Sequence, residues 1–190
     1  MSDLDGYATS LLRGRLVRLR ALRDDDLPQL VQWWNDPETM VLQQHRVLPG
    51  PEAALTEMFR AWSANKDDSG AGFSIETHDG ELVGHVTMWG IKPRTRIATL
   101  AIIIGLPHAG RGYGTDTLDV ALRYAFDELA VNKVELQVWA FNSRAVHVYE
   151  KVGFVEEGRR RAAAYHRSAF HDEVLMGMLR DEFERRPATT

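Results

Sequence analysis

A glycine-rich stretch with one arginine, GLPHAGRGYGTDT at residues 105–117, is well suited to bind an anion. It stands between the apolar run IATLAIII and an amphipathic segment, so we expect it to join a strand to a helix. The first N–H groups of such a helix lack partners within it and lie at the positive end of its dipole. Glycines would let these amides approach a phosphate, while an arginine in the loop would add a positive charge and a threonine a hydroxyl group. The residues concerned are Gly110, Arg111, Gly112, Gly114 and Thr115.

Two common nucleotide-binding motifs do not match this stretch. The P-loop needs a lysine directly after a glycine, and none occurs here. The dinucleotide fingerprint needs G-x-G-x-x-G, but the sixth position counted from Gly110 or Gly112 is a threonine. The residues alone therefore leave two interpretations open, a phosphate-binding loop and a flexible glycine-rich turn.

A second stretch, FNSRAVHVYEKVGF at residues 141–154, combines polar and aromatic residues at helical spacing. Asn142 can cap a helix that Gly153 ends, and Ala145, Tyr149 and Val152 would share one face of it. By this pattern alone Tyr149 is a core residue.

The surrounding elements alternate between periods of two and of three to four residues. The order is strand, two helices, three strands, helix, strand, helix and two strands, which predicts a mixed sheet with helices on both faces. Asp36-Pro37 is expected to end the first helix, and a basic loop to join the last two strands. The segments are 14–22, 27–34, 51–62, 73–77, 81–90, 96–105, 115–130, 133–140, 142–152, 153–161 and 170–179.

Composition limits the possible classes of protein. With 190 residues, 44% of them hydrophobic, we expect one domain over residues 12–180, with flexible ends at 1–11 and 181–190. A net charge of -4 argues against nucleic acid as a partner, and the longest apolar run, about ten residues, is too short to span a membrane. The chain has no cysteine and its histidines show no metal-ligand spacing, so we expect a cytoplasmic protein without a metal.

The two stretches together resemble the GNAT superfamily of acyl-CoA-dependent N-acyltransferases. Within it they are similar to the Rim-type branch of ribosomal-protein N-terminal acetyltransferases and spermidine acetyltransferases. The resemblance covers roughly residues 12–180. It is carried by AGRGYGT at 109–115, YAFDELAVNKVELQV at 124–138, FNSRAVHVYEKVGFVEEGR at 141–159 and, more weakly, WWNDPE at 33–38.

This resemblance implies a mixed, mostly antiparallel, seven-stranded sheet of the α/β (α+β) class. Its strands 97–104 and 133–140 would run parallel and splay apart, and the pantetheine arm of acetyl-CoA would lie in that gap with its pyrophosphate on the glycine loop. A homodimer is also implied. The implied cofactor-binding residues are Ile102, Ile103, Ile104, Ala109, Gly110, Arg111, Gly112, Tyr113, Gly114, Thr115, Asn142, Arg144 and Tyr149.

The implied reaction transfers an acetyl group to a primary amine by direct attack in a ternary complex. The amine, with a pKa of about 10, must lose a proton, the new oxyanion needs a donor, and the thiolate needs a proton. A backbone N–H around Ile104 is the natural oxyanion donor. The resemblance makes Tyr149 the general acid. A non-catalytic acyl-CoA-binding or regulatory module with the same fold is the alternative.

Two residues depart from the family pattern. Ala109 stands where relatives carry Arg or Gln, which removes a phosphate contact. Thr99 stands where Rim-type relatives often carry the glutamate proposed to take the amine's proton, a task threonine cannot perform. The sequence then leaves His85, Glu76, Asp36 and solvent as bases.

The acceptor also stays open among a protein N-terminus, a polyamine, an aminoglycoside and a small metabolite, and the acyl chain between acetyl and succinyl. We expect the early helices to form the acceptor pocket, with Trp33, Asp36 and His85 as candidate substrate residues and His45 as a further possible base.

Overall fold

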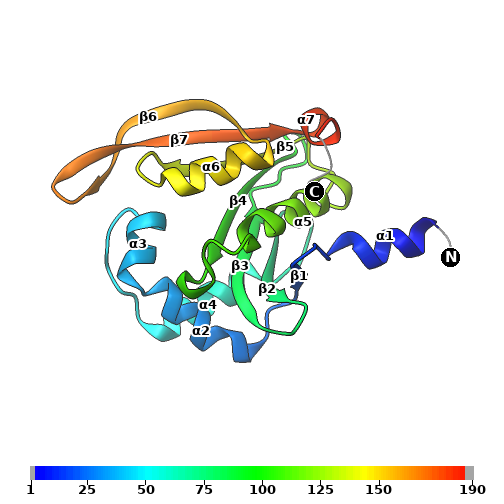
Figure 1. The fold of residues 1–190 in the computed structure, drawn as a ribbon, viewed down its shortest axis with the longest axis horizontal. Coiled ribbons are helices and arrows are strands. Elements are labelled where there is room, and N and C mark those ends of the chain that lie inside the picture. Colours follow the sequence, from blue (N-terminus) through cyan, green and yellow to red (C-terminus); the bar gives the residue numbers. More distant parts are fainter. Residues whose placement is uncertain (1–2, 187–190) are drawn as a thin grey trace.

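Seven strands form one mixed sheet in the computed structural model, which describes residues 3–186 (Figure 1). The strand order is β1-β2-β3-β4-β5-β7-β6, and all neighbours are antiparallel except the parallel pair β4 and β5. This confirms the predicted fold class. The strands are β1 (Val17–Arg20), β2 (Ala71–Thr77), β3 (Leu82–Trp89), β4 (Ile97–Ile104), β5 (Lys133–Trp139), β6 (Val155–His166) and β7 (Ala169–Leu179).

Helices cover both faces of this sheet, as predicted (Figure 1). Buried residues of α5 and α6 pack on one face, and those of α2 and α4 pack on the other in a separate cluster that includes Ile103. The helices are α1 (Asp3–Leu11), α2 (Leu27–Trp34), α3 (Pro37–Gln43), α4 (Glu52–Trp62), α5 (Tyr113–Asp127), α6 (Ser143–Val152) and α7 (Arg180–Glu184).

Strands β4 and β5 pair along one end only. Their register runs from Ile97 opposite Lys133 to Thr99 opposite Glu135 and stops there, although β4 continues to Ile104 and β5 to Trp139. Each strand keeps its other neighbour beyond this point, β3 for β4 and β7 for β5. The strands therefore part within the sheet, which confirms the predicted splay.

The start of α5 is fixed to the chain that leads into β1. The Asp116 carboxylate, in the first turn of α5, accepts hydrogen bonds from the N–H groups of Arg15 at 2.9 Å, Leu16 at 2.7 Å and Val17 at 2.9 Å. A Cβ atom at Gly14 would lie 2.3 Å from this carboxylate, so the approach depends on glycine there. These bonds hold the glycine-rich loop in place relative to the sheet.

Helix α3 is an element that the sequence analysis did not predict. Asp36-Pro37 was expected to end a helix, and α2 does end before it, but the same dipeptide begins α3. The Asp36 carboxylate accepts hydrogen bonds from the N–H groups of Glu38 at 2.9 Å and Thr39 at 3.2 Å, and Pro37 occupies the first helical turn. An aspartate followed by proline favours a helix start for these two reasons.

The terminal segments contain helices that the sequence analysis did not predict, and the last hairpin differs from expectation. Helix α1 forms within the segment 1–11 that was expected to be flexible, and the Arg123 guanidinium donates to the carbonyl of Ser10 at 2.7 Å. Helix α7 begins at Arg180, while residues 187–190 of the expected flexible tail lie outside the described residues. The expected loop between β6 and β7 is mostly strand, because Arg167 and Ser168, both with positive φ, complete a tight turn.

Candidate functional site

A cavity of about 840 Å³ occupies the place where β4 and β5 part. Its lining includes residues from both faces of the sheet: Leu118 and Tyr149 belong to the α5 and α6 side, whereas Ile103 and Trp62 belong to the α2 and α4 side. The cavity therefore passes through the sheet. It collects most of the predicted site residues: Ile102, Ile103, Ile104, Ala109, Gly110, Gly112, Gly114, Thr115, Asn142, Arg144, Tyr149 and His85.

The glycine-rich loop presents a run of free backbone amides beside this cavity. None of the N–H groups from Gly110 to Thr115 donates a hydrogen bond to any residue between 3 and 186. Gly110, with φ +78°, and Gly112, with φ +86°, adopt the left-handed conformation that turns the chain into α5. These amides fit a phosphate group at a helix N-terminus. Arg111 is exposed and Tyr113 packs on the core, and neither lines the cavity.

The β4 backbone directs some of its polar groups into the gap. The N–H of Gly105 donates to the carbonyl of Val83 at 2.9 Å, so this pair is hydrogen-bonded. Because hydrogen-bonded and non-hydrogen-bonded pairs alternate in an antiparallel ladder, Ile104, opposite Gly84, turns its N–H away from β3 toward the gap.

The same alternation distinguishes the two isoleucines before it. Ile102 also faces the gap, and its carbonyl accepts a hydrogen bond at 3.1 Å from Gln43 Nε2 of α3. Ile103 instead directs its backbone groups to β3, opposite His85. Of the three isoleucines predicted to contact the cofactor through their backbone, Ile102 and Ile104 face the gap and Ile103 does not.

Tyr149 lies on the α6 wall of the cavity with its hydroxyl free. It is half-buried, its ring packs edge-on against Phe154, and its hydroxyl has no hydrogen-bond partner among residues 3–186. Burial raises the pKa of Tyr149 to about 12, so the phenol keeps its proton at neutral pH. A protonated phenol facing a cavity can act as a general acid.

Helix α6 begins at the same cavity. The Asn142 side chain accepts a hydrogen bond from the N–H of Ala145 at 3.2 Å, which confirms the predicted cap, and it also lines the cavity. Arg144 is exposed at the cavity edge. Gly153 ends α6 with φ +109°, as predicted.

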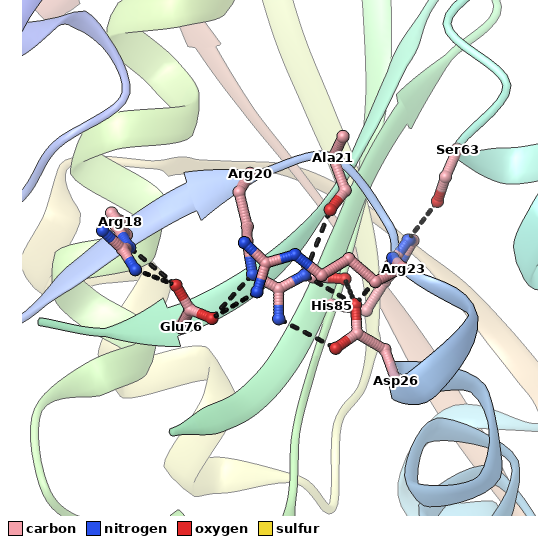
Figure 2. A network of polar contacts seen from close by, with 9 residues as sticks. Arg18, Arg20, Ala21, Arg23, Asp26, Ser63, Glu76 and His85 are labelled. Carbon is pink, nitrogen blue, oxygen red and sulfur yellow. Dashed lines mark hydrogen bonds and ion pairs between the residues drawn. The ribbon is translucent and has the colours of Figure 1, made fainter. Parts of the chain in front are cut away.

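Glu76, one of the four candidate bases, is enclosed in an ion-pair network away from the cavity (Figure 2). Its carboxylate, 1% exposed, accepts hydrogen bonds from Arg18 at 2.6 Å, Arg20 at 2.8 Å and Arg23 at 3.3 Å. Although burial acts to raise its pKa, the hydrogen bonds from Arg20 and Arg18 hold that pKa below its usual range. Glu76 is therefore a structural group and not a base for the reaction.

Asp36 and His85 have different positions. Asp36 caps α3 and lines a separate concavity of about 660 Å³ with Asp24 and Glu52. His85 lines the main cavity, where its Nε2 lies 2.7 Å from Ser63 Oγ, and burial lowers its pKa to about 4 (Figure 2). Of Glu76, Asp36 and His85, only His85 lines the main cavity, and the further possible base His45 lines it as well.

Three other residues considered in the sequence analysis, Trp33, His45 and Thr99, differ in their position relative to the cavity. Trp33 is 7% exposed and packs in the second core, where a Cβ atom at Gly105 would lie 2.4 Å from its ring, so it does not wall the cavity. His45 does line the cavity, with its ring 5.0 Å from that of Trp139. Thr99 lies in the paired part of β4, where its hydroxyl donates to Glu135 at 3.4 Å, and it does not line the cavity.

Many further residues that the sequence analysis did not single out line the cavity, and four of them bear on its chemistry. Gln43 belongs to α3, which was not predicted, and Trp62 lies at the end of α4. Trp139 and Glu173 face each other across β5 and β7. Strand alternation alone could have placed these last two on the face opposite Val138 and Val174, but it could not show that this face borders a cavity.

Within residues 3–186, no group of three or more His, Cys, Asp or Glu side chains is arranged to hold a metal ion. Over the same residues, no helix combines the length and apolarity needed to cross a bilayer.

Known proteins resemble this chain along most of its length. A family model described as acetyltransferase (GNAT) domain matches residues 16–155. The SPbeta prophage-derived uncharacterized N-acetyltransferase YokL of Bacillus subtilis is 26% identical, covering 93% of this chain and 97% of its own length. The spermidine N(1)-acetyltransferase of Escherichia coli (strain K12) is 28% identical, with 88% of each chain covered.

A solved structure extends the resemblance to three dimensions. The spermidine N-acetyltransferase from Vibrio cholerae, crystallised in complex with CoA and spermine, superimposes with a TM-score of 0.80 at 28% identity. The match covers 89% of this chain and 98% of that chain. Together with the splayed parallel strands and the free amides at the start of α5, these matches show that the protein belongs to the GNAT family of N-acetyltransferases.

Proposed function

We propose that this enzyme transfers an acetyl group from acetyl-CoA to a primary amine by direct attack within a ternary complex. The observation that carries the proposal is one continuous cavity, which joins the free amides of the glycine-rich loop, the gap-facing backbone of Ile104 and the free hydroxyl of Tyr149. An anion site, an oxyanion donor and an acid are the groups that acyl transfer from a CoA thioester requires.

The residues present fit coenzyme A. The amides of Gly110 to Thr115 would hold the pyrophosphate, and Arg111, exposed beside them, would neutralise part of its charge. Ile102 and Ile104 would bind the pantetheine arm through the backbone, with Asn142 and Arg144 at the other wall. Ala109, also in the lining, offers no side-chain contact to phosphate, so the backbone carries more of the binding.

Two groups of the chain would assist the reaction itself. Acetyl-CoA, when bound, supplies the activated acetyl thioester. The N–H of Ile104 would donate to the oxygen that becomes negatively charged, a contribution of about 3 kcal/mol for one such donor. Tyr149 would give its proton to the departing sulfur, since its raised pKa keeps it protonated at neutral pH.

The fate of the amine's proton follows from what lines the cavity. His85 is uncharged at neutral pH, but a pKa of about 4 makes it a weak base. Thr99, at the position where Rim-type relatives often carry a glutamate, lies outside the cavity lining. We therefore propose that the amine binds as an ammonium ion and loses its proton to water before attack.

Thiol release tests the proposal. Acetyl-CoA and succinyl-CoA are offered side by side with spermidine, a peptide with a free N-terminus, an aminoglycoside and a small amino metabolite. We expect release from acetyl-CoA that depends on one class of amine. CoA binding without release for any of these amines would instead favour a non-catalytic acyl-CoA-binding module.

A further inference from the structure

One carboxylate, that of Glu173, lines the cavity within the part of the chain that the structure describes. The lining also contains two basic side chains, Arg144 and Lys151, and both belong to α6. Glu173 comes from β7 and lies on the other face of the sheet from α6. The charged residues of the lining therefore differ between the two faces of the sheet, with cations on the α6 side and a carboxylate opposite.

The position of Glu173 follows from strand alternation. Val138 of β5 and Val174 of β7 are register partners, and both pack in the core beneath α5 and α6. Since successive side chains of a strand point to opposite faces, Trp139 and Glu173, the next register pair, point toward the α3 side. An acceptor approaching from that side would meet Glu173 before it reached the α6 wall.

The Glu173 carboxylate is buried and one of its oxygens is available. The residue is 4% exposed, and Oε2 accepts a hydrogen bond at 2.7 Å from Arg160 Nη1 of β6. Oε1 accepts no hydrogen bond from residues 3–186, and it is not among the buried side-chain atoms without a partner, so it stays accessible from the cavity. Arg160, whose side chain is 57% exposed, thus orients the carboxylate without occupying both of its oxygens.

Two aromatic rings lie on the same side of the sheet as Glu173. Trp139 is the register partner of Glu173, and the ring of His45 packs against it at 5.0 Å. Both rings line the cavity. A carboxylate beside an indole is a favourable environment for an ammonium group, which gains an ion pair and a cation–π contact.

We infer that Glu173 binds the ammonium group of the acceptor and so selects cationic primary amines as substrates. The inference rests on the proposed function, because it assigns the acceptor side of the same cavity. It accounts for an oriented carboxylate with a free oxygen on the face opposite the cationic wall. It concerns binding of the protonated amine and assigns no proton transfer to Glu173.

Calorimetric titration of the CoA-saturated protein tests the inference without turnover. The probes are spermidine, a tripeptide with a free amino terminus and the same tripeptide acetylated at that terminus. We expect spermidine or the free tripeptide to bind wild-type protein and the acetylated tripeptide not to bind. Glu173→Gln should weaken that binding about tenfold or more, the size of a lost hydrogen bond to a charged group.

Two control variants separate amine binding from a structural role of the ion pair. Arg160→Gln removes the same ion pair but keeps the carboxylate, so it should bind the amine at least as tightly as wild type. Glu156→Gln breaks the pair of Glu156 with Arg159 on the same hairpin, outside the cavity lining, and should leave the affinity unchanged. Equal losses in Arg160→Gln and Glu173→Gln would overturn the inference.

Other outcomes are equally decisive. Wild-type affinity in Glu173→Gln, or no binding of either amine to wild-type protein, overturns the assignment of Glu173. Should Glu173→Gln fail to fold, Glu173→Asp decides, since a shortened arm must weaken binding of the amine. If the wild-type protein binds the amine but releases no thiol, the proposed function is refuted and this inference stands. If thiol is released and Glu173→Gln binds the amine with wild-type affinity, this inference is refuted and the proposed function stands.

Discussion

The Nε2 atom of His85 lies 2.7 Å from the hydroxyl oxygen of Ser63 (Figure 2), and His85 itself belongs to the cavity lining. The imidazole also packs edge-on against Phe59, with ring centres 5.3 Å apart. His85 is 1% exposed, and burial lowers its pKa from 6.5 to about 4. The folded protein therefore contains a neutral histidine that the unfolded chain would protonate in mild acid.

We expect the protein to lose stability as the pH falls from 6.5 toward 4. In this window the unfolded state binds one more proton at His85, so the free energy of unfolding decreases with falling pH, by about 3 kcal/mol in all. Urea unfolding across the window measures the slope. His85→Gln should flatten it, whereas His78→Gln, at an exposed position, should not.

Replacement of Tyr149 by phenylalanine should lower kcat about a hundredfold or more, because general acid catalysis typically contributes that much. CoA affinity should change little, since the variant keeps the ring against Phe154. Steady-state thiol release and CoA titration together check both parts. Tyr124→Phe is the matched control, because Tyr124, which belongs to α5, packs against Phe73 and lies outside the cavity lining. Equal kcat in wild type and Tyr149→Phe would exclude Tyr149 as the acid.

The pH dependence of kcat/KM for the amine should rise from neutral to alkaline pH without a descending limb below about pH 10. The rise reflects deprotonation of the amine, with a pKa of about 10. The acid is not lost in this range because the pKa of Tyr149 is about 12. A rate profile measured with saturating acetyl-CoA checks this, and a decline near pH 8.5 would point to another acid.

Gly110→Ala should weaken CoA binding, because the new methyl group would stand among the free amides and strain a backbone with φ +78°. Gly80→Ala is a close control. Gly80 has φ +91°, and a Cβ atom there, as at Gly110, would meet nothing within 4 Å. Both variants should lose about 1 kcal/mol of stability from the backbone strain. Calorimetry should find weaker CoA binding in Gly110→Ala alone, and equal losses of affinity would argue against a phosphate site in the loop.

Arg20→Ala should reduce the free energy of unfolding by about 3 kcal/mol, since it leaves two buried carboxylates without their shared partner. The guanidinium of Arg20 lies 2.7 Å from Asp26 and 2.8 Å from Glu76. Arg60→Ala breaks exposed pairs with Asp24 and Glu57 and should cost less than about 1 kcal/mol. Urea titration of both variants distinguishes a buried network from surface pairs.

The parts of the site that follow from local backbone chemistry could be predicted from the sequence. Gly153 ends α6 and Asn142 caps it, both as predicted, and Gly112 uses the backbone freedom of glycine to turn the chain into α5. In each case the residue type acts on its own turn of chain, so distant contacts do not alter the result.

Features set by distant contacts were less predictable. The sequence pattern of β2 does not distinguish a catalytic from a structural role for Glu76. Its structural role is set by three arginines that are 53 to 58 residues away in the chain. Trp33 belongs to the core because Gly105 leaves room for its ring. Helix α3 was missed because one aspartate both follows a helix and caps the next.

The short pairing of β4 with β5 also determines how two reactants can meet. Because the cavity lining comes from both faces of the sheet, the thioester and the amine of the proposed reaction would reach the gap from opposite faces. The two reactants of the proposed ternary complex would then meet within the sheet, in the gap between β4 and β5.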